Sequence, residues 1–220
     1  MTWRNTTERY GSLSVGMHWL MLLLLVAVYA TINLADAFPK GSDLRAAMQT
    51  WHFMLGLSVF VLVGARLVIR FLSGPAPGIE PQVPAWQLRA AHTVHAALYV
   101  FMIGMPLLGW LALSAGGKPI PFFGLELPAL LGADKNLASS LKEVHETIGT
   151  LGYWLIGLHA AAALFHHYVT HDTTLARMLP GARVRFGRGA AQADGTPSNS
   201  SGHPTRTPGR LRRPRYPSPP

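Results

Sequence analysis

The sequence predicts an all-α integral membrane protein, a four-helix bundle with a disordered C-terminal tail. About half of the 220 residues are hydrophobic and only 13% are charged, whereas a soluble domain carries roughly a quarter charged residues. The mean hydropathy is positive although the last part of the chain is polar. Four apolar segments also reach the roughly 20 residues that a helix needs to cross a bilayer.

The four apolar segments define the predicted spans. They run from about Ser14 to Leu34, Ala47 to Phe71, Trp86 to Leu113 and Leu141 to Thr170. The first follows Arg4 and Arg9, as a signal peptide would, but its apolar core is longer than a usual signal core, so we expect it to be retained. Pro106 lies within the third span, where a proline usually bends a membrane helix without ending it.

Glycine and proline mark the connections and the end of the predicted domain. A Ser-Gly-Pro stretch at 73–78 and a longer Gly- and Pro-rich stretch at 116–132 predict loops. Residues 1–180 thus form the predicted membrane domain. Residues 181–220 are rich in Gly, Pro, Ser, Thr and Arg and nearly free of aliphatic side chains, which predicts a disordered basic tail. Such a tail can contact anionic lipid, although a solvated extension without a role is more common.

The basic residues predict the orientation. The formal charge is +9, but much of the excess lies in the tail and the rest flanks the apolar segments, so we do not expect nucleic-acid binding. Arginines cluster at the N-terminus, around the second loop and after the fourth span, whereas the other two loops balance bases with acids. The positive-inside rule then places both termini in the cytoplasm.

The absence of cysteine restricts the possible cofactors. It excludes disulfides, cysteine-ligated iron–sulfur clusters, thiolate zinc sites and covalently attached haem. A metal cofactor would need nitrogen or oxygen ligands, and the ten histidines are the obvious supply. Several of them lie within the predicted spans, where ionisable residues are costly and usually functional.

Four histidines form two pairs by depth. His145 and His159 are fourteen residues apart in the fourth span, which separates them by about 21 Å along a helix and leaves them on nearly the same face. His52 begins the second span and matches His145 near the outer surface. His18 begins the first span and matches His159 near the cytoplasmic surface. We refer to His52 and His145 as the outer pair and to His18 and His159 as the inner pair.

Two such pairs predict two b-type haems. The iron of each haem would receive one imidazole from the fourth span and one from another span. Six-coordinate iron of this kind suits electron transfer and leaves no position for oxygen. Gly149 and Gly152 lie between the two histidines of the fourth span, and Gly56 follows His52 by one turn. Glycine at these positions would leave flat space for a porphyrin. A haem-free transporter that uses the histidines for protons or divalent metal is an alternative, and it predicts a colourless protein.

Other polar residues have less specific predictions. Arg66, Arg70 and Lys142 are candidates for binding haem propionates, and interfacial anchoring is the alternative for each. His166 lies one heptad beyond His159 and could line a quinone or proton site, although an interfacial histidine is the more frequent case. His92 and His95 in the third span are predicted to be packing or hydrogen-bonding residues, because one helix does not ligate a haem face twice.

Several motifs resemble the prokaryotic cytochrome b561 family over about residues 8 to 180. They are Ser-Val-Gly-Met-His-Trp-Leu at 14–20, Trp-His at 51–52, His-Glu-Thr at 145–147, Ile-Gly-Leu-His-Ala-Ala-Ala-Ala-Leu at 156–164, His-His-Tyr at 166–168 and Arg-Met-Leu-Pro at 177–180. The resemblance implies a four-helix bundle with two b haems, and its axial ligands match His18, His52, His145 and His159. It also implies a multi-pass protein of the bacterial inner membrane.

The resemblance further implies electron exchange with ubiquinone and, for at least one member, oxidation of superoxide. The leading hypothesis is therefore a superoxide:ubiquinone oxidoreductase. Basic residues in the outer loops would attract the anionic substrate, although nearby acids weaken that field; they are Lys40, Arg45, Lys118, Lys135 and Lys142. The related cytochrome b subunits of hydrogenases and formate dehydrogenases suggest the alternative, a membrane anchor and electron relay for a partner subunit.

Overall fold

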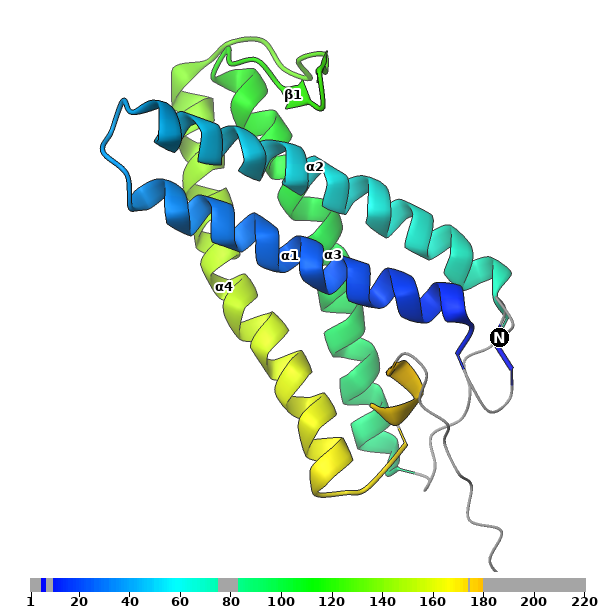
Figure 1. The fold of residues 1–220 in the computed structure, drawn as a ribbon. Helices are drawn as coiled ribbons and strands as arrows, with labels where there is room; N and C mark the ends of the chain where they lie inside the picture. The colour runs from blue at the N-terminus through cyan, green and yellow to red at the C-terminus, as the bar shows by residue number, and fades with distance from the viewer. Residues whose placement is uncertain (1–4, 7–9, 75–82, 174, 180–220) are drawn as a thin grey trace, which may run out of the picture. The chain divides into compact units, whose positions relative to one another are not determined.

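The fold is dominated by four long helices. The computed structural model describes residues 5–6, 10–74, 83–173 and 175–179. Within them the helices are α1 (Ser12–Asp36), α2 (Asp43–Leu72), α3 (Ala85–Ala115) and α4 (Lys135–Tyr168), drawn in Figure 1. Each is long and apolar enough to cross a membrane, which confirms the predicted four-helix membrane bundle. The predicted tail at 181–220, its boundary with the 1–180 domain, and part of the predicted 73–78 loop lie outside the described residues.

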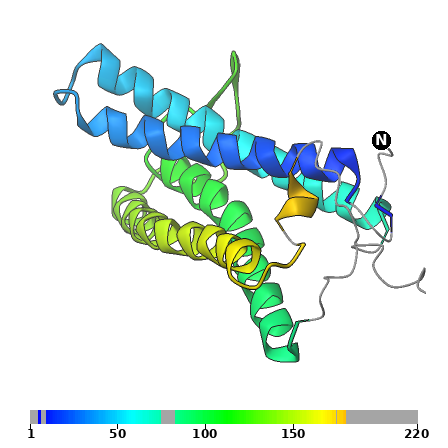
Figure 2. The same cartoon turned by 60° about the horizontal axis from the view of Figure 1, so that its bottom comes forward.

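The helices pack as two antiparallel pairs. Helix α1 lies along α2, α3 lies along α4, and α2 also contacts α3. Figure 2 shows the α1–α2 pair crossing over the α3–α4 pair. Met21, Val59, Val63 and Met102 form a buried cluster where three of the helices meet. Large apolar side chains elsewhere point outward, as expected for helices whose outer surface meets lipid.

Arg45 stabilises the turn between α1 and α2. Its guanidinium group donates hydrogen bonds to the carbonyl oxygens of Ala35 at 3.0 Å and Phe38 at 3.2 Å. It also forms an ion pair with Asp36 at 2.8 Å. The guanidinium group thus caps the Ala35 carbonyl in the last turn of α1 and the Phe38 carbonyl in the turn that follows.

The helices are longer than the predicted spans. Helix α2 begins at Asp43 and α4 begins at Lys135, whereas the apolar pattern begins at about residues 47 and 141. A side-chain cap precedes each: Ser42 accepts from the Arg45 amide at 3.3 Å, and Asp134 accepts from the Asn136 amide at 2.9 Å. Hydropathy locates only the part of a helix within lipid. It therefore does not detect polar first turns, which depend on caps of this kind.

The connection between α3 and α4 contains a hairpin that the loop prediction missed. Strands β1 (Pro121–Phe122) and β2 (Leu125–Glu126) pair antiparallel. The turn residues Phe123 and Gly124 have φ of 47° and 87°, as a two-residue hairpin turn requires. Phe123 donates its amide to the sulfur of Met54 at 3.4 Å, which docks the hairpin on α2 two residues after His52.

Candidate functional site

The outer pair is brought together from α2 and α4. The ring centroids of His52 and His145 lie 6.2 Å apart with their planes at 85°. His52 Nδ1 lies 3.0 Å from the carbonyl oxygen of Val28 on α1. Because a carbonyl can only accept, Nδ1 carries the proton and Nε2 is left available to bind a metal ion. This is the usual arrangement for a metal-binding histidine.

The ring of His145 lies against the backbone of α3. A Cβ at Gly109 would be 3.3 Å from His145 Cε1 and 3.6 Å from Nδ1. Glycine at 109 therefore leaves the space that the imidazole occupies, and α3 holds His145 in place without contributing a side chain.

The inner pair joins α1 and α4. The ring centroids of His18 and His159 lie 6.3 Å apart with their planes at 68°. The next residue, Trp19, donates its indole N–H to the carbonyl oxygen of Met178 at 2.6 Å. This bond ties the short 3₁₀ helix η1 (Ala176–Met178) to α1 beside His18.

The spacing within both pairs fits an iron ion between the imidazoles. Metal–nitrogen bonds of about 2.0 Å, with each nitrogen about 1.1 Å from its ring centre, place two opposed imidazoles about 6.2 Å apart. A direct hydrogen bond between such rings would bring the centres to about 5.1 Å. The observed 6.2 and 6.3 Å agree with the first value. The structure thus brings together the histidines that depth had paired, and their role as haem ligands stays a prediction.

One predicted porphyrin surface is wrong. The position of a Cβ at Gly152 is already taken by the hydroxyl of Tyr29 and the ring of Phe101. Gly152 therefore allows α1 and α3 to approach α4, and its lack of a side chain serves helix packing. Gly149 faces Met105 Cε at 3.5 Å from its Cβ position, whereas no atom lies within 4 Å of that position at Gly56.

The two predicted arginines lie near the inner pair. Arg66 is close enough to interact electrostatically with both inner-pair histidines and with His95. Arg70 also interacts with His95. Both guanidinium groups therefore lie in the neighbourhood of the inner pair, and their binding of haem propionates stays a prediction.

Arg177 is a third arginine in this region, and the sequence analysis used it for orientation and as part of the family motif at 177–180, without predicting a place for it in the site. It lies in η1 with 7% of its surface exposed. Burial raises the pKa of Tyr10, and the guanidinium groups of Arg70, Arg177 and Arg66 oppose that rise. The available signal was the Arg-Met-Leu-Pro motif itself, but apolar periodicity could not show that η1 folds back onto α1.

Two other predicted residues are paired with carboxylates. Lys142 forms an ion pair with Glu146 at 2.5 Å, and both side chains are largely exposed. His166 Nδ1 lies 2.6 Å from Asp172 Oδ2, and the Asp172 side chain is only 1% exposed. His166 is thus held by a buried carboxylate, which a freely solvated interfacial histidine would not be.

His95 is placed beside the inner pair. Its ring centroid lies 5.2 Å from that of His159. The prediction left packing and hydrogen bonding open for His92 and His95 alike. The structure separates them, because His95 is in ring contact with the predicted ligand His159, whereas His92 interacts electrostatically with His95.

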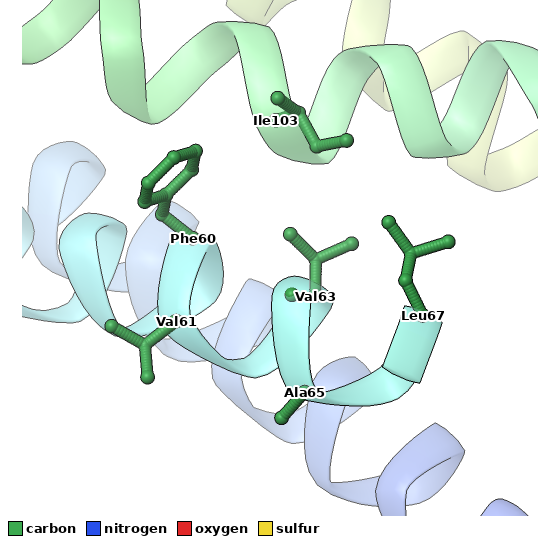
Figure 3. A pocket seen from close by; sticks show the side chains of 7 residues that line it. Phe60, Val61, Val63, Ala65, Leu67 and Ile103 are labelled. Carbon is green, nitrogen blue, oxygen red and sulfur yellow. The ribbon is translucent and has the colours of Figure 1, made fainter. Parts of the chain in front are cut away.

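An apolar groove lies between α2 and α3. Figure 3 shows side chains that line it, and its volume is about 540 Å³. The lining residues are Phe60, Val61, Val63, Gly64, Ala65, Leu67 and Ile103. None of these side chains can ligate iron or hydrogen-bond a quinone carbonyl, so the candidate redox site is at the histidine pairs.

Comparison with known proteins gives one consistent family. The model of a family described as prokaryotic cytochrome b561 matches residues 9–181. Cytochrome b561 homolog 1 of Escherichia coli K12 is 38% identical over 79% of this chain and 98% of its own length. The probable superoxide oxidase CybB of Yersinia pestis is 36% identical over 80% of this chain and 98% of its own length. Cytochrome b561 homolog 2 of E. coli K12 is 30% identical over 85% and 100%, respectively.

Proposed function

The chain belongs to the prokaryotic cytochrome b561 family of bacterial membrane electron-transfer proteins, which implies haem b, and we propose that it holds two such haems and transfers electrons from superoxide to ubiquinone. The observation that carries the proposal is the pair of facing imidazoles at each end of the bundle, 6.2 and 6.3 Å apart. The similarity to a probable superoxide oxidase suggests the donor.

The close approach within each histidine pair supports the assignment of the haem-binding residues. His52 and His145 would hold the outer haem, and His18 and His159 would hold the inner one. Arg66 and Arg70 would bind propionates on the inner side, and Lys142 would do so on the outer side. Haems held in this way would supply reversible one-electron chemistry, and two imidazole ligands for each iron would favour outer-sphere transfer from the donor.

Basic side chains on the outer side guide the anionic substrate. Of the five bases in the outer loops, Arg45 and Lys142 are already paired with Asp36 and Glu146. Among the described residues no salt bridge involves the remaining three, Lys40, Lys118 and Lys135. We therefore assign most of the electrostatic attraction to these three lysines.

The quinone reaction needs protons as well as electrons. Two superoxide ions give two electrons and leave as two molecules of oxygen, and one ubiquinone takes these electrons and two protons to form ubiquinol. His166, held by Asp172, lies about 10 Å beyond His159 along α4. We assign it to the quinone site or to its proton supply on the cytoplasmic side. This assignment follows the proposed topology, a multi-pass inner-membrane protein with both termini in the cytoplasm.

The experiment is stopped-flow mixing of the oxidised, detergent-purified protein with superoxide, followed at the haem absorbance bands. We expect haem reduction faster than spontaneous dismutation, and reoxidation when ubiquinone is added. Superoxide dismutase should abolish the reduction, and dithionite should show that both haems remain competent. If superoxide leaves competent haems oxidised, the electron relay for a partner dehydrogenase or hydrogenase becomes the better function. A colourless folded protein would favour the transporter.

A further inference from the structure

His95 on α3 is a histidine to which the proposed binding of two haems assigns no role, although its ring contacts that of His159. It lies ten residues into α3, about 15 Å along the helix axis, and so within the membrane-spanning part. A histidine at such a depth needs a partner, because an unsatisfied polar group in hydrocarbon is costly. Its ring faces the ring of His159 with the planes at 65°.

The distances distinguish the roles of the two histidines beside His159. The 6.3 Å between His159 and His18 leaves room for iron between the rings. The 5.2 Å between His159 and His95 is too short for two metal–nitrogen bonds and close to the roughly 5.1 Å expected when one imidazole hydrogen-bonds another. His95 therefore does not compete with His18 for the iron. The two rings meet edge to face without forming that hydrogen bond, so the bond requires a rotation of one ring.

The outer and inner pairs also differ in what supports their ligands. On the outer side, His52 is held by the Val28 carbonyl, and the ring of His145 lies against the backbone at Gly109. On the inner side, His159 has a side chain beside it instead of a carbonyl. The nitrogen of a metal-bound histidine that is not bonded to the metal nearly always donates its proton to an acceptor, which fixes the ring and raises its basicity.

We propose that His95 is a positioning residue of the inner haem and accepts a hydrogen bond from the ring N–H of His159. The inference rests on the proposed binding of two haems. A neutral imidazole has one acceptor nitrogen available for this bond. Accepting the proton makes His159 a more basic ligand, which stabilises ferric over ferrous iron. His95 thereby lowers the midpoint potential of the inner haem and leaves the outer haem unaffected.

The test compares three variants of the full-length purified protein. His95→Leu removes the acceptor, His95→Gln restores one through its side-chain carbonyl, and His92→Leu is the matched control one turn away on the same helix. Haem per chain is measured first, and each haem is then titrated optically against potential and followed by electron paramagnetic resonance. The component that disappears in His159→Ala identifies the inner haem.

We expect His95→Leu to retain both haems, to raise the midpoint of the inner haem only and to change only its resonance signal. His95→Gln should lie close to the unsubstituted protein, and His92→Leu should match it. An unchanged inner midpoint in His95→Leu would overturn the proposal. Loss of the inner haem in both His95 variants would also overturn it, because His95 would then be a ligand. Fewer than two haems in the unsubstituted protein would instead contradict the proposed function.

Discussion

Tyr29 on α1 donates a hydrogen bond to the carbonyl oxygen of Gly149 on α4 at 2.7 Å. Its ring also packs on Tyr153 with the centroids 4.3 Å apart, and Tyr153 accepts a hydrogen bond from Asn33 at 2.7 Å. These contacts join α1 to α4 at positions between the two histidines of α4. They therefore fix the helix that carries His18 against the helix that carries His159.

Replacing Tyr29 with Phe should weaken this joint without opening a cavity. The free energy of unfolding should fall by about 0.5–1.5 kcal/mol, with about 0.6 kcal/mol the average for such bonds in a membrane. The change is measured by denaturing each variant in detergent, with the loss of haem absorbance as the signal that monitors unfolding. Tyr168→Phe is the control, because Tyr168 is exposed. Equal stability of the two variants would contradict a structural role for the Tyr29 bond.

Adding a methyl group at Gly152 should separate helices that now touch. In Gly152→Ala the new Cβ meets Tyr29 and Phe101, and overpacking of this kind costs about 1–3 kcal/mol. Gly157→Ala is the matched control on the same helix, because nothing lies within 4 Å of its Cβ position. That variant should gain up to about 1 kcal/mol of helix propensity. The free energy of unfolding of both variants is measured with the same assay. An unchanged free energy of unfolding in Gly152→Ala would show that Tyr29 and Phe101 do not pack closely against the backbone at Gly152.

Neutralising the unpaired lysines should slow the reaction with superoxide. We expect Lys40→Gln, Lys118→Gln and Lys135→Gln together to lower the second-order rate of haem reduction several-fold at low salt. The difference should shrink as ionic strength rises, because a Debye length of about 10 Å at 0.1 M salt screens such charges. Arg45 is unsuitable as a control because it stabilises the α1–α2 turn, and Lys142 because it is assigned to a propionate. Arg89→Gln serves instead, because Arg89 is an exposed base near the start of α3, on the opposite side of the proposed topology. A deficit that is independent of salt would argue against electrostatic steering.

Deleting residues 190–220 should leave haem content and electron transfer unchanged. The composition of this segment gives it few apolar side chains with which to pack. Haem per chain and the superoxide-dependent reduction rate are the two measurements. Loss of both haems in the truncated protein would mean that the tail contributes to the folded bundle.

The sequence predicted how deep each histidine lies in the membrane, but it did not predict which helices lie beside one another. Hydropathy set the level of each histidine in the membrane, and helical periodicity put His145 and His159 on one face, so the pairs could be predicted before any packing was known. Which helix lies beside His159 depends on how the two helix pairs cross, and no apolar pattern encodes that crossing. The contact of His95 and the packing at Gly152 were missed for this reason.

The other omissions have local causes. The hairpin at Phe123 has strands of only two residues, too short for an alternating pattern to be recognised. Arg177 lies in a 3₁₀ turn of three residues, whose position depends on the hydrogen bond from Trp19. Short elements held by single tertiary contacts leave little periodic signal.

The assignment of two haems to separate histidine pairs is tested most directly by four single substitutions. His18→Ala, His52→Ala, His145→Ala and His159→Ala are purified, and haem per chain is measured with low-temperature difference spectra. We predict about two haems in the unsubstituted protein, loss of one spectral component in the His52 and His145 variants, and loss of the other in the His18 and His159 variants. If the His18 and His52 variants lost the same component, the pairing would be wrong.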